Sequence, residues 1–119
     1  MHNFRELKVW QKSRLLVKEV YILTAEYPTT EKYNLCSQMQ SCAVSIPSNI
    51  AEGSGRSTDV DFARFLDISM GSSHELESQL FLSFDLGYVS QEKLDLFLEM
   101  VWEVQKMITG LINKLRGKQ

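Results

Sequence analysis

The chain has 119 residues, of which 44% are hydrophobic and 24% are charged, and its formal net charge is −2. These values are ordinary for a globular protein, so we expect a single domain over residues 1–119. They exclude a membrane-spanning protein, because no apolar run approaches the roughly 20 residues that a span needs. The first residues also lack the apolar region of a signal peptide, so we expect a cytoplasmic protein with no membrane partner.

Turn-forming residues at 27–30, 53–55 and 87–90 divide the chain into four segments with helical periodicity. The first predicted helix runs from about Phe4 to Glu26. Its apolar seam recurs at steps of three and four residues and consists of Val9, Ser13, Leu16, Val20, Leu23 and Tyr27. A second stripe lies beside this seam and contains Leu7, Trp10, Val17 and Tyr21.

The second predicted helix begins at Glu31 or Ser37 and ends at Glu52. One side of it carries Leu35, Met39, Cys42, Ala43, Ile46 and Ile50. Pro47 within this helix removes one backbone hydrogen bond and crowds a carbonyl of the preceding turn, which predicts a kink.

The third predicted helix begins at Thr58 or Asp59, either of which can cap it, and ends at Leu86. Its seam is Phe62, Leu66, Ser69, Ser73, Leu76, Leu80 and Phe84. The fourth begins after Ser90, and its seam is Leu94, Phe97, Val101, Val104, Ile108, Leu111 and Leu115. Short connections make neighbouring helices antiparallel, so we predict an all-α, up-down-up-down four-helix bundle.

A polar motif interrupts the apolar pattern of the second and third helices. In the second helix it comprises Ser41, Ser45, Pro47, Asn49, Glu52 and Gly53, and in the third Ser69, Gly71, Ser72, Ser73 and Glu75. We interpret it as a buried hydrogen-bond network that fixes helix register, with small residues at close approaches; a ligand site is the alternative. Glu52 and Arg56 are spaced to form an ion pair, and Gly53-Ser54-Gly55 is typical of a helix stop.

The fourth predicted helix carries more apolar residues than a helix needs to pack into one bundle core. The surplus on the fourth helix is Leu96, Leu98, Met100, Trp102, Met107 and Ile112. An exposed apolar patch indicates an interface between subunits, whereas a wide core with scattered surface residues is the alternative.

Charge is segregated along the sequence. Residues 1–18 and 105–119 together contain nine basic residues and one acidic residue, whereas residues 19–104 contain four basic and fourteen acidic residues. In the predicted topology the start of the first helix and the end of the last lie at one end of the bundle. Cations in the last turn complement the helix dipole, but those in the first helix do not. The basic end therefore indicates either dipole compensation or a surface for phosphates or an acidic partner.

Motifs for catalysis are missing from the sequence. A di-iron bundle needs Glu-x-x-His on two helices, and the chain has only His2 and His74. One helical histidine excludes a Ser-His-Asp triad, and the two cysteines, Cys36 and Cys42, make no zinc site without nearby histidines. We interpret both as small buried thiols. We expect no enzyme activity, no metal and no cofactor.

Three stretches carry a resemblance to a known family. They are Phe4-Arg5-Glu6-Leu7-Lys8-Val9-Trp10-Gln11, then Ser45-Ile46-Pro47-Ser48-Asn49-Ile50-Ala51-Glu52-Gly53-Ser54-Gly55-Arg56, and in the third helix Phe62 to Leu66 with Gly71-Ser72 and Glu75-Leu76-Glu77. The chain resembles the four-helix-bundle proteins of the 23S rRNA intervening-sequence type, which are encoded within bacterial ribosomal RNA genes. The resemblance implies a homopentameric ring and kinship with the accessory protein of diversity-generating retroelements, which engages a reverse transcriptase and nucleic acid. The family commonly has two basic residues where this chain has Gln40 and Ser41, which weakens the implication of nucleic-acid binding.

The sequence therefore predicts a non-enzymatic, homo-oligomeric scaffold that binds RNA or a nucleic-acid-bound protein through its basic end. The residues expected to bind are Arg5, Lys8, Lys12, Arg14, Arg56, Lys114, Arg116 and Lys118. The alternative is a protein-interaction adaptor with no affinity for nucleic acid.

Overall fold

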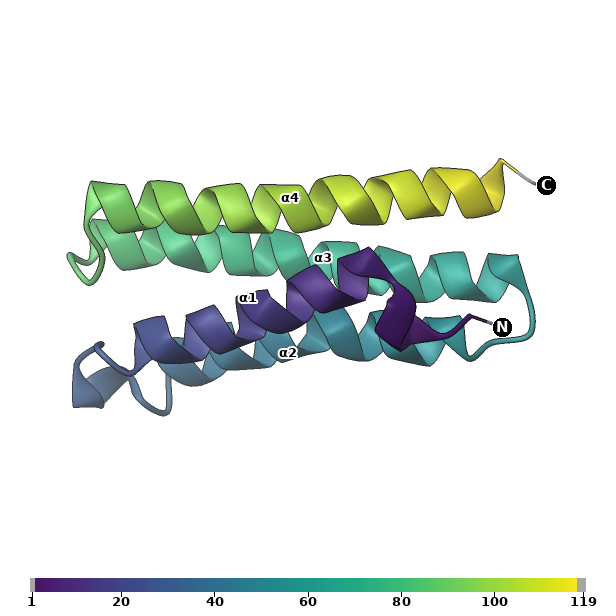
Figure 1. Ribbon diagram of the computed structural model, residues 1–119. Helices are drawn as coiled ribbons and strands as arrows, with labels where there is room; N and C mark the ends of the chain where they lie inside the picture. Colours follow the sequence, from purple (N-terminus) through teal and green to yellow (C-terminus); the bar gives the residue numbers. More distant parts are fainter. Residues whose placement is uncertain (1, 118–119) are drawn as a thin grey trace.

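The computed structural model describes residues 2–117, which form four long helices and two short 3-10 helices without a strand. The long helices are α1 (Lys8–Thr24), α2 (Leu35–Ser54), α3 (Asp59–Asp85) and α4 (Gln91–Arg116), and the 3-10 helices are η1 (Phe4–Glu6) and η2 (Thr29–Glu31). Consecutive helices are antiparallel and pack side by side in a bundle of 46 × 23 × 20 Å (Figure 1). The predicted all-α up-down-up-down bundle is confirmed.

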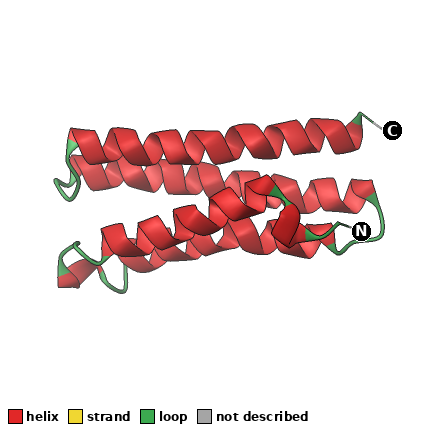
Figure 2. Cartoon of the chain, viewed as in Figure 1, coloured by secondary structure: helices red, strands yellow, loops and turns green. Residues whose placement is uncertain are grey.

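The connections are short and gather at the two ends of the bundle (Figure 2). The loop from α2 to α3 lies at the end where both chain termini lie, and the other two loops lie at the opposite end (Figure 1). Helix α1 packs chiefly on α2 and makes a smaller interface with α4. No helix of the described residues has the length and hydropathy of a membrane span.

The N-terminal segment departs from the predicted continuous helix. Leu7 has extended backbone angles of φ −74° and ψ 123°, so the chain turns between η1 and α1. The side chain of Asn3 accepts a hydrogen bond from the Arg5 amide at 3.2 Å, which holds η1. The turn places the Phe4 ring edge-on to Trp10, with 5.0 Å between ring centroids. A helix from Phe4 was therefore wrong, because local capping and aromatic packing redirect the chain.

The other helix boundaries are close to their predicted positions. α1 ends at Thr24 and α2 begins at Leu35, and η2 lies between them. The Thr58 side chain accepts from the amide of the third residue of α3, and Ser90 does the same for α4, so both are N-caps. α2 runs without a break through Pro47 to Ser54. The kink at Pro47 stays a prediction.

The core follows the predicted seams with one shift. Most seam residues are less than 9% exposed, and Cys36 and Cys42 are buried free thiols, as predicted. Phe84, however, is 36% exposed, and Ser83 is fully buried in its place. Leu76, Leu80 and Ser83 continue the alternating steps of four and three residues that begin at Phe62, whereas Phe84 follows Leu80 by four residues and breaks that alternation. Leu98 and Ile112 are also buried, so the surplus apolar surface of α4 is smaller than predicted.

Candidate functional site

The polar motif of α2 and α3 forms the predicted hydrogen-bond network. The buried Ser69 hydroxyl donates to the carbonyl oxygen of Ile46 at 2.9 Å. The Ser72 hydroxyl donates to the Ser45 hydroxyl at 2.8 Å, and the Asn49 amide nitrogen donates to the same hydroxyl at 3.0 Å. These bonds join residues 23 and 27 positions apart, so they hold one axial register between the two helices. The two bonds between the helices support the predicted role in fixing register, and the ligand site stays the alternative, because Ser45 and Ser72 also line a hollow with Ser41 and Glu75.

The two glycines of the motif have different surroundings. A Cβ on Gly53 would stand 2.7 Å from the Phe65 Cβ and 2.8 Å from the Phe62 ring, so this position sets the close approach of α2 and α3. Gly53 lies in the last turn of α2, which ends at Ser54 with Gly55 as its C-cap, so the predicted helix stop at Gly53-Ser54-Gly55 is confirmed. Gly71 is exposed, and a Cβ there would meet nothing within 4 Å. The close approach predicted at Gly71 was therefore wrong.

Arg56 lies just beyond the network, at the end of the bundle that carries the termini. Its guanidinium stands 3.9 Å from the Glu52 carboxylate, which confirms the predicted ion pair. The same guanidinium lies 4.7 Å from the centroid of the Phe65 ring. Arg56 therefore contacts two side chains of its own chain, Glu52 and Phe65.

The predicted basic end is spread over a larger part of the bundle. The Lys12 ammonium is 3.2 Å from the Glu103 carboxylate, and the Arg116 guanidinium is 2.6 Å from that of Asp67. Glu103 precedes Arg116 by thirteen residues of α4, or about 20 Å along the helix axis. Lys12 is therefore near the middle of the bundle. A single cluster of eight cations at one end was wrong.

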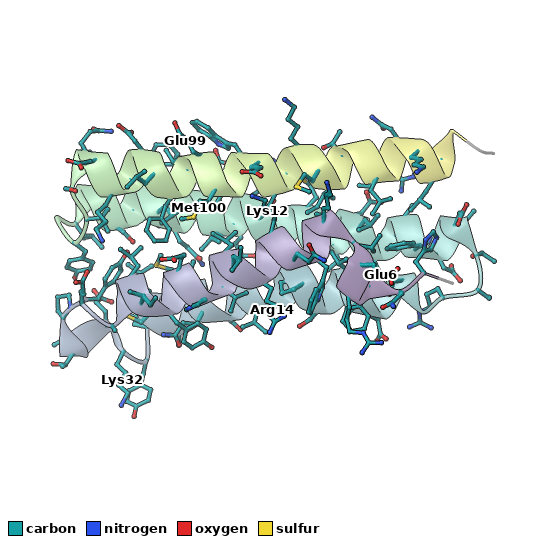
Figure 3. The ribbon with its side chains drawn as sticks, viewed as in Figure 1. Glu6, Lys12, Arg14, Lys32, Glu99 and Met100 are labelled. Atoms are coloured by element: carbon teal, nitrogen blue, oxygen red, sulfur yellow. The ribbon has the colours of Figure 1, made fainter. Side chains whose placement is uncertain are left out.

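Four of the eight predicted cations have no carboxylate partner among residues 2–117. They are Arg5, Lys8, Arg14 and Lys114, and Lys118 lies outside the described residues. Figure 3 shows Lys12 on the side of α1 that faces α4 and Arg14 on the side away from α4. Lys8 precedes Lys12 by one helical turn, and Lys114 follows Glu103 by three turns, so both belong to the α1–α4 side. We call Arg5, Lys8 and Lys114, which come from the first and last segments of the chain, the terminal cations.

Arg14 belongs to a separate feature on the α1–α2 side. A hollow of about 340 Å³ is lined by six apolar residues, Phe4, Trp10, Val17, Val44, Pro47 and Ala51. Arg14 and Ser48 complete the lining, and no carboxylate takes part. The Arg14 guanidinium lies 5.4 Å from the centroid of the Trp10 ring, within reach of a cation–π contact. We call this feature the α1–α2 hollow; the sequence indicated only its Trp10 stripe.

The sequence analysis did not predict that Glu77 of α3 accepts hydrogen bonds from two residues of α4. The Glu77 carboxylate accepts hydrogen bonds from Trp102 Nε1 at 3.1 Å and from Gln105 Nε2 at 2.9 Å. Burial acts to raise the pKa of Glu77, but the bonds from Gln105 and Trp102 outweigh it and hold the pKa below its usual 4.5. The spacing of three residues between Trp102 and Gln105 indicates that they share one side of α4. Spacing does not identify Glu77 as their partner, because that depends on the register between α3 and α4.

Cys42 lies beside the polar network. Burial, followed by its contact with the Glu75 carboxylate, raises the pKa of the Cys42 thiol from 9.0 to about 11. Gln79 Nε2 lies 3.5 Å from the Cys42 sulfur. A thiol with so high a pKa is a poor nucleophile at neutral pH. Within residues 2–117 no group of three His, Cys, Asp or Glu side chains is placed to hold a metal ion.

The chain matches a known protein family. The model of the 23S rRNA-intervening sequence protein family matches residues 5–110. The chain belongs to that family. The match spans the N-terminal turn, the polar motif of α2 and α3, and most of α4, which confirms the resemblance drawn from the motifs.

Solved structures agree on the fold of this 23S rRNA-intervening sequence protein. A crystal structure of a protein of unknown function from the S23 ribosomal protein family of Bacteroides thetaiotaomicron superposes with a TM-score of 0.81. It is 21% identical in sequence, and the match covers 88% of this chain and 95% of the other. No curated protein matches the chain. These comparisons therefore establish the family and the fold. A function has to be inferred from the residues on the surface of the bundle.

Proposed function

We propose that this family member is a non-enzymatic scaffold that assembles as a homopentameric ring and binds RNA or a ribonucleoprotein through its terminal cations. The observation that supports binding is the pairing pattern of the basic residues. Lys12, Arg56 and Arg116 have carboxylate partners in the same chain, whereas Arg5, Lys8 and Lys114 have none among the described residues. Unpaired cations are the groups that exchange counterions for phosphates.

Assembly bears directly on affinity. Three cations give a weak contact, because the logarithm of the affinity for single strands changes by only about 0.7 per phosphate for each decade of salt. A ring repeats the terminal cations on every subunit, and linked contacts on one RNA bind more tightly than one contact alone. Light scattering on the purified protein tests the assembly, and a mass other than five subunits overturns the pentamer.

The binding test is a gel shift of a labelled single-stranded RNA at low salt and again at high salt. Lys8→Glu combined with Lys114→Glu is expected to abolish the shift, and high salt is expected to weaken it for the native chain. Lys93→Glu is the matched control, because Lys93 is exposed in the first turn of α4 at the opposite end of the bundle. Equal retention by the double variant and the control overturns RNA binding at the terminal cations.

A protein-interaction adaptor is the second candidate. It is favoured by the overall charge of −2 and by the three cations already neutralised within the chain. On this alternative the terminal cations meet an acidic protein, and the native chain shifts no RNA even at low salt. The same gel therefore separates the two candidates.

A further inference from the structure

Two exposed apolar features lie on opposite sides of the bundle. One is the α1–α2 hollow, where Val44 is 38% exposed. The other is on α3 and α4, where Phe81 is 44% and Trp102 is 48% exposed; we call Phe81, Trp102 and the neighbouring Glu77 and Glu99 the acidic aromatic face. Figure 3 shows Arg14 at one edge of the molecule and Glu99 at the opposite edge.

The charges of the two features are complementary. Arg14 is the only charged residue that lines the hollow, and it has no carboxylate partner among the described residues. Carboxylates flank Trp102 on the other side, with Glu77 bonded to its indole nitrogen and Glu99 exposed one turn earlier on α4. Opposite charges around facing apolar surfaces steer association and fix its orientation.

The two features also lie at the same height along the bundle. The bond from Trp102 to Glu77 aligns α4 with α3 at this level. The bonds from Gln79 to Cys42 and from Ser72 to Ser45 place Glu77 beside residues 42–45 of α2, which include Val44. Copies packed through these features would therefore stand side by side along their lengths.

The hollow has the size and chemistry for an aromatic side chain. Its volume of about 340 Å³ exceeds the roughly 150 Å³ of an engineered apolar cavity that holds benzene. Tryptophan and arginine are the residues that most often dominate binding energy at protein interfaces. A half-exposed Trp102 bordered by carboxylates fits an apolar hollow bordered by Arg14.

We propose that the α1–α2 hollow of one copy receives the acidic aromatic face of a second copy, with Trp102 in the hollow and Arg14 against Glu77 and Glu99. This inference rests on the homo-oligomer of the proposed function and names its interface. The contact joins different surfaces of identical chains, so it is heterologous and leaves one free hollow and one free face on every open assembly. Such a contact closes only as a ring.

The test uses two variants, each of which disables one surface. Val44→Glu places a carboxylate in the hollow, and Trp102→Ala removes the side chain that enters it. Sedimentation velocity is expected to show a monomer for each variant alone. In an equal mixture, the intact face of Val44→Glu pairs with the intact hollow of Trp102→Ala, so a dimer and no larger species is expected. Leu15→Glu is the control, because Leu15 is 57% exposed on α1 outside both surfaces, and it should keep the native mass.

The outcomes separate this interface from the oligomer itself. A native chain that is a monomer overturns both the homo-oligomer and its interface. A native oligomer that persists in both variants overturns the interface alone, and so does a mixture of monomeric variants that yields no dimer. Arg14→Glu, which changes an exposed side chain, gives a further readout that does not depend on the core. It is expected to raise the dissociation constant at least tenfold with unchanged helical circular dichroism, and an unchanged constant contradicts the pairing of Arg14.

Discussion

Gly53 of α2 and Phe65 of α3 approach so closely that a Cβ on the glycine would stand 2.7 Å from the phenylalanine Cβ. The nearest atom is the Cβ of Phe65, and a Cβ cannot move unless the backbone of its helix moves with it. It lies next to the hydrogen bonds that set the register of the two helices. The close packing at Gly53 therefore lies beside the polar network.

Gly53→Ala is expected to lower the free energy of unfolding by about 1–2 kcal/mol. Overpacking costs about 1–3 kcal/mol, which exceeds the gain of about 1 kcal/mol in helix propensity. Gly71→Ala is the matched control, because Gly71 is exposed in α3 with nothing within 4 Å of an added Cβ. It should raise stability by about 0.5–1 kcal/mol. Urea unfolding followed by circular dichroism measures both, and equal shifts of the same sign would contradict the close approach.

Ser69→Ala is expected to lower the free energy of unfolding by about 1 kcal/mol. The substitution removes a buried hydrogen bond between α3 and the Ile46 carbonyl. Ser78→Ala is the control on α3, because Ser78 is exposed. The control should be neutral or slightly stabilising, and a Ser69 variant as stable as the control would show that the network has no energetic role.

Stability is expected to fall between about pH 9 and pH 11 through Cys42. Its pKa is raised from 9.0 to about 11 in the folded chain, so the unfolded chain loses the thiol proton first. The contribution of this thiol is fully present below pH 9 and is lost as the pH rises toward the folded pKa. Urea midpoints at pH 7, 9 and 10 measure the effect, and Cys42→Ala should remove that part of the alkaline decline. An identical decline in the variant would assign it to other groups.

The Arg116–Asp67 pair is expected to contribute only about 0.2–1 kcal/mol to stability. Both side chains are about half exposed, at 48% and 52%, so water competes for their charges despite the distance of 2.6 Å. A double-mutant cycle with Arg116→Ala and Asp67→Ala measures the coupling, which should shrink at 1 M salt. A coupling above 2 kcal/mol at high salt would contradict this account.

The sequence by itself determined the four helices, the starts of α3 at Thr58 or Asp59 and of α4 after Ser90, and the side of each helix that faces the core. These properties are local, since a helix repeats every 3.6 residues and a cap acts within one turn. Spacing also predicted the polar network, because Ser45 and Asn49 share a face. The first error lay in the last step of the α3 seam: a step of four residues from Leu80 placed Phe84 inward, whereas a step of three reaches the buried Ser83.

Tertiary structure alone decided which cations are free and which glycine is crowded. Lys12 reaches Glu103 and Arg116 reaches Asp67 because of the axial register between helices, which depends on packing across tens of residues. Gly53 and Gly71 look alike in the sequence, yet one faces Phe65 and the other faces open space. The packing of α1 against α2 and α4 likewise separated Arg14, which lines the α1–α2 hollow, from Lys12, which pairs with Glu103 of α4. Helical periodicity determines which side of a helix faces the core. The axial position of a residue relative to a neighbouring helix is set only when the two helices pack.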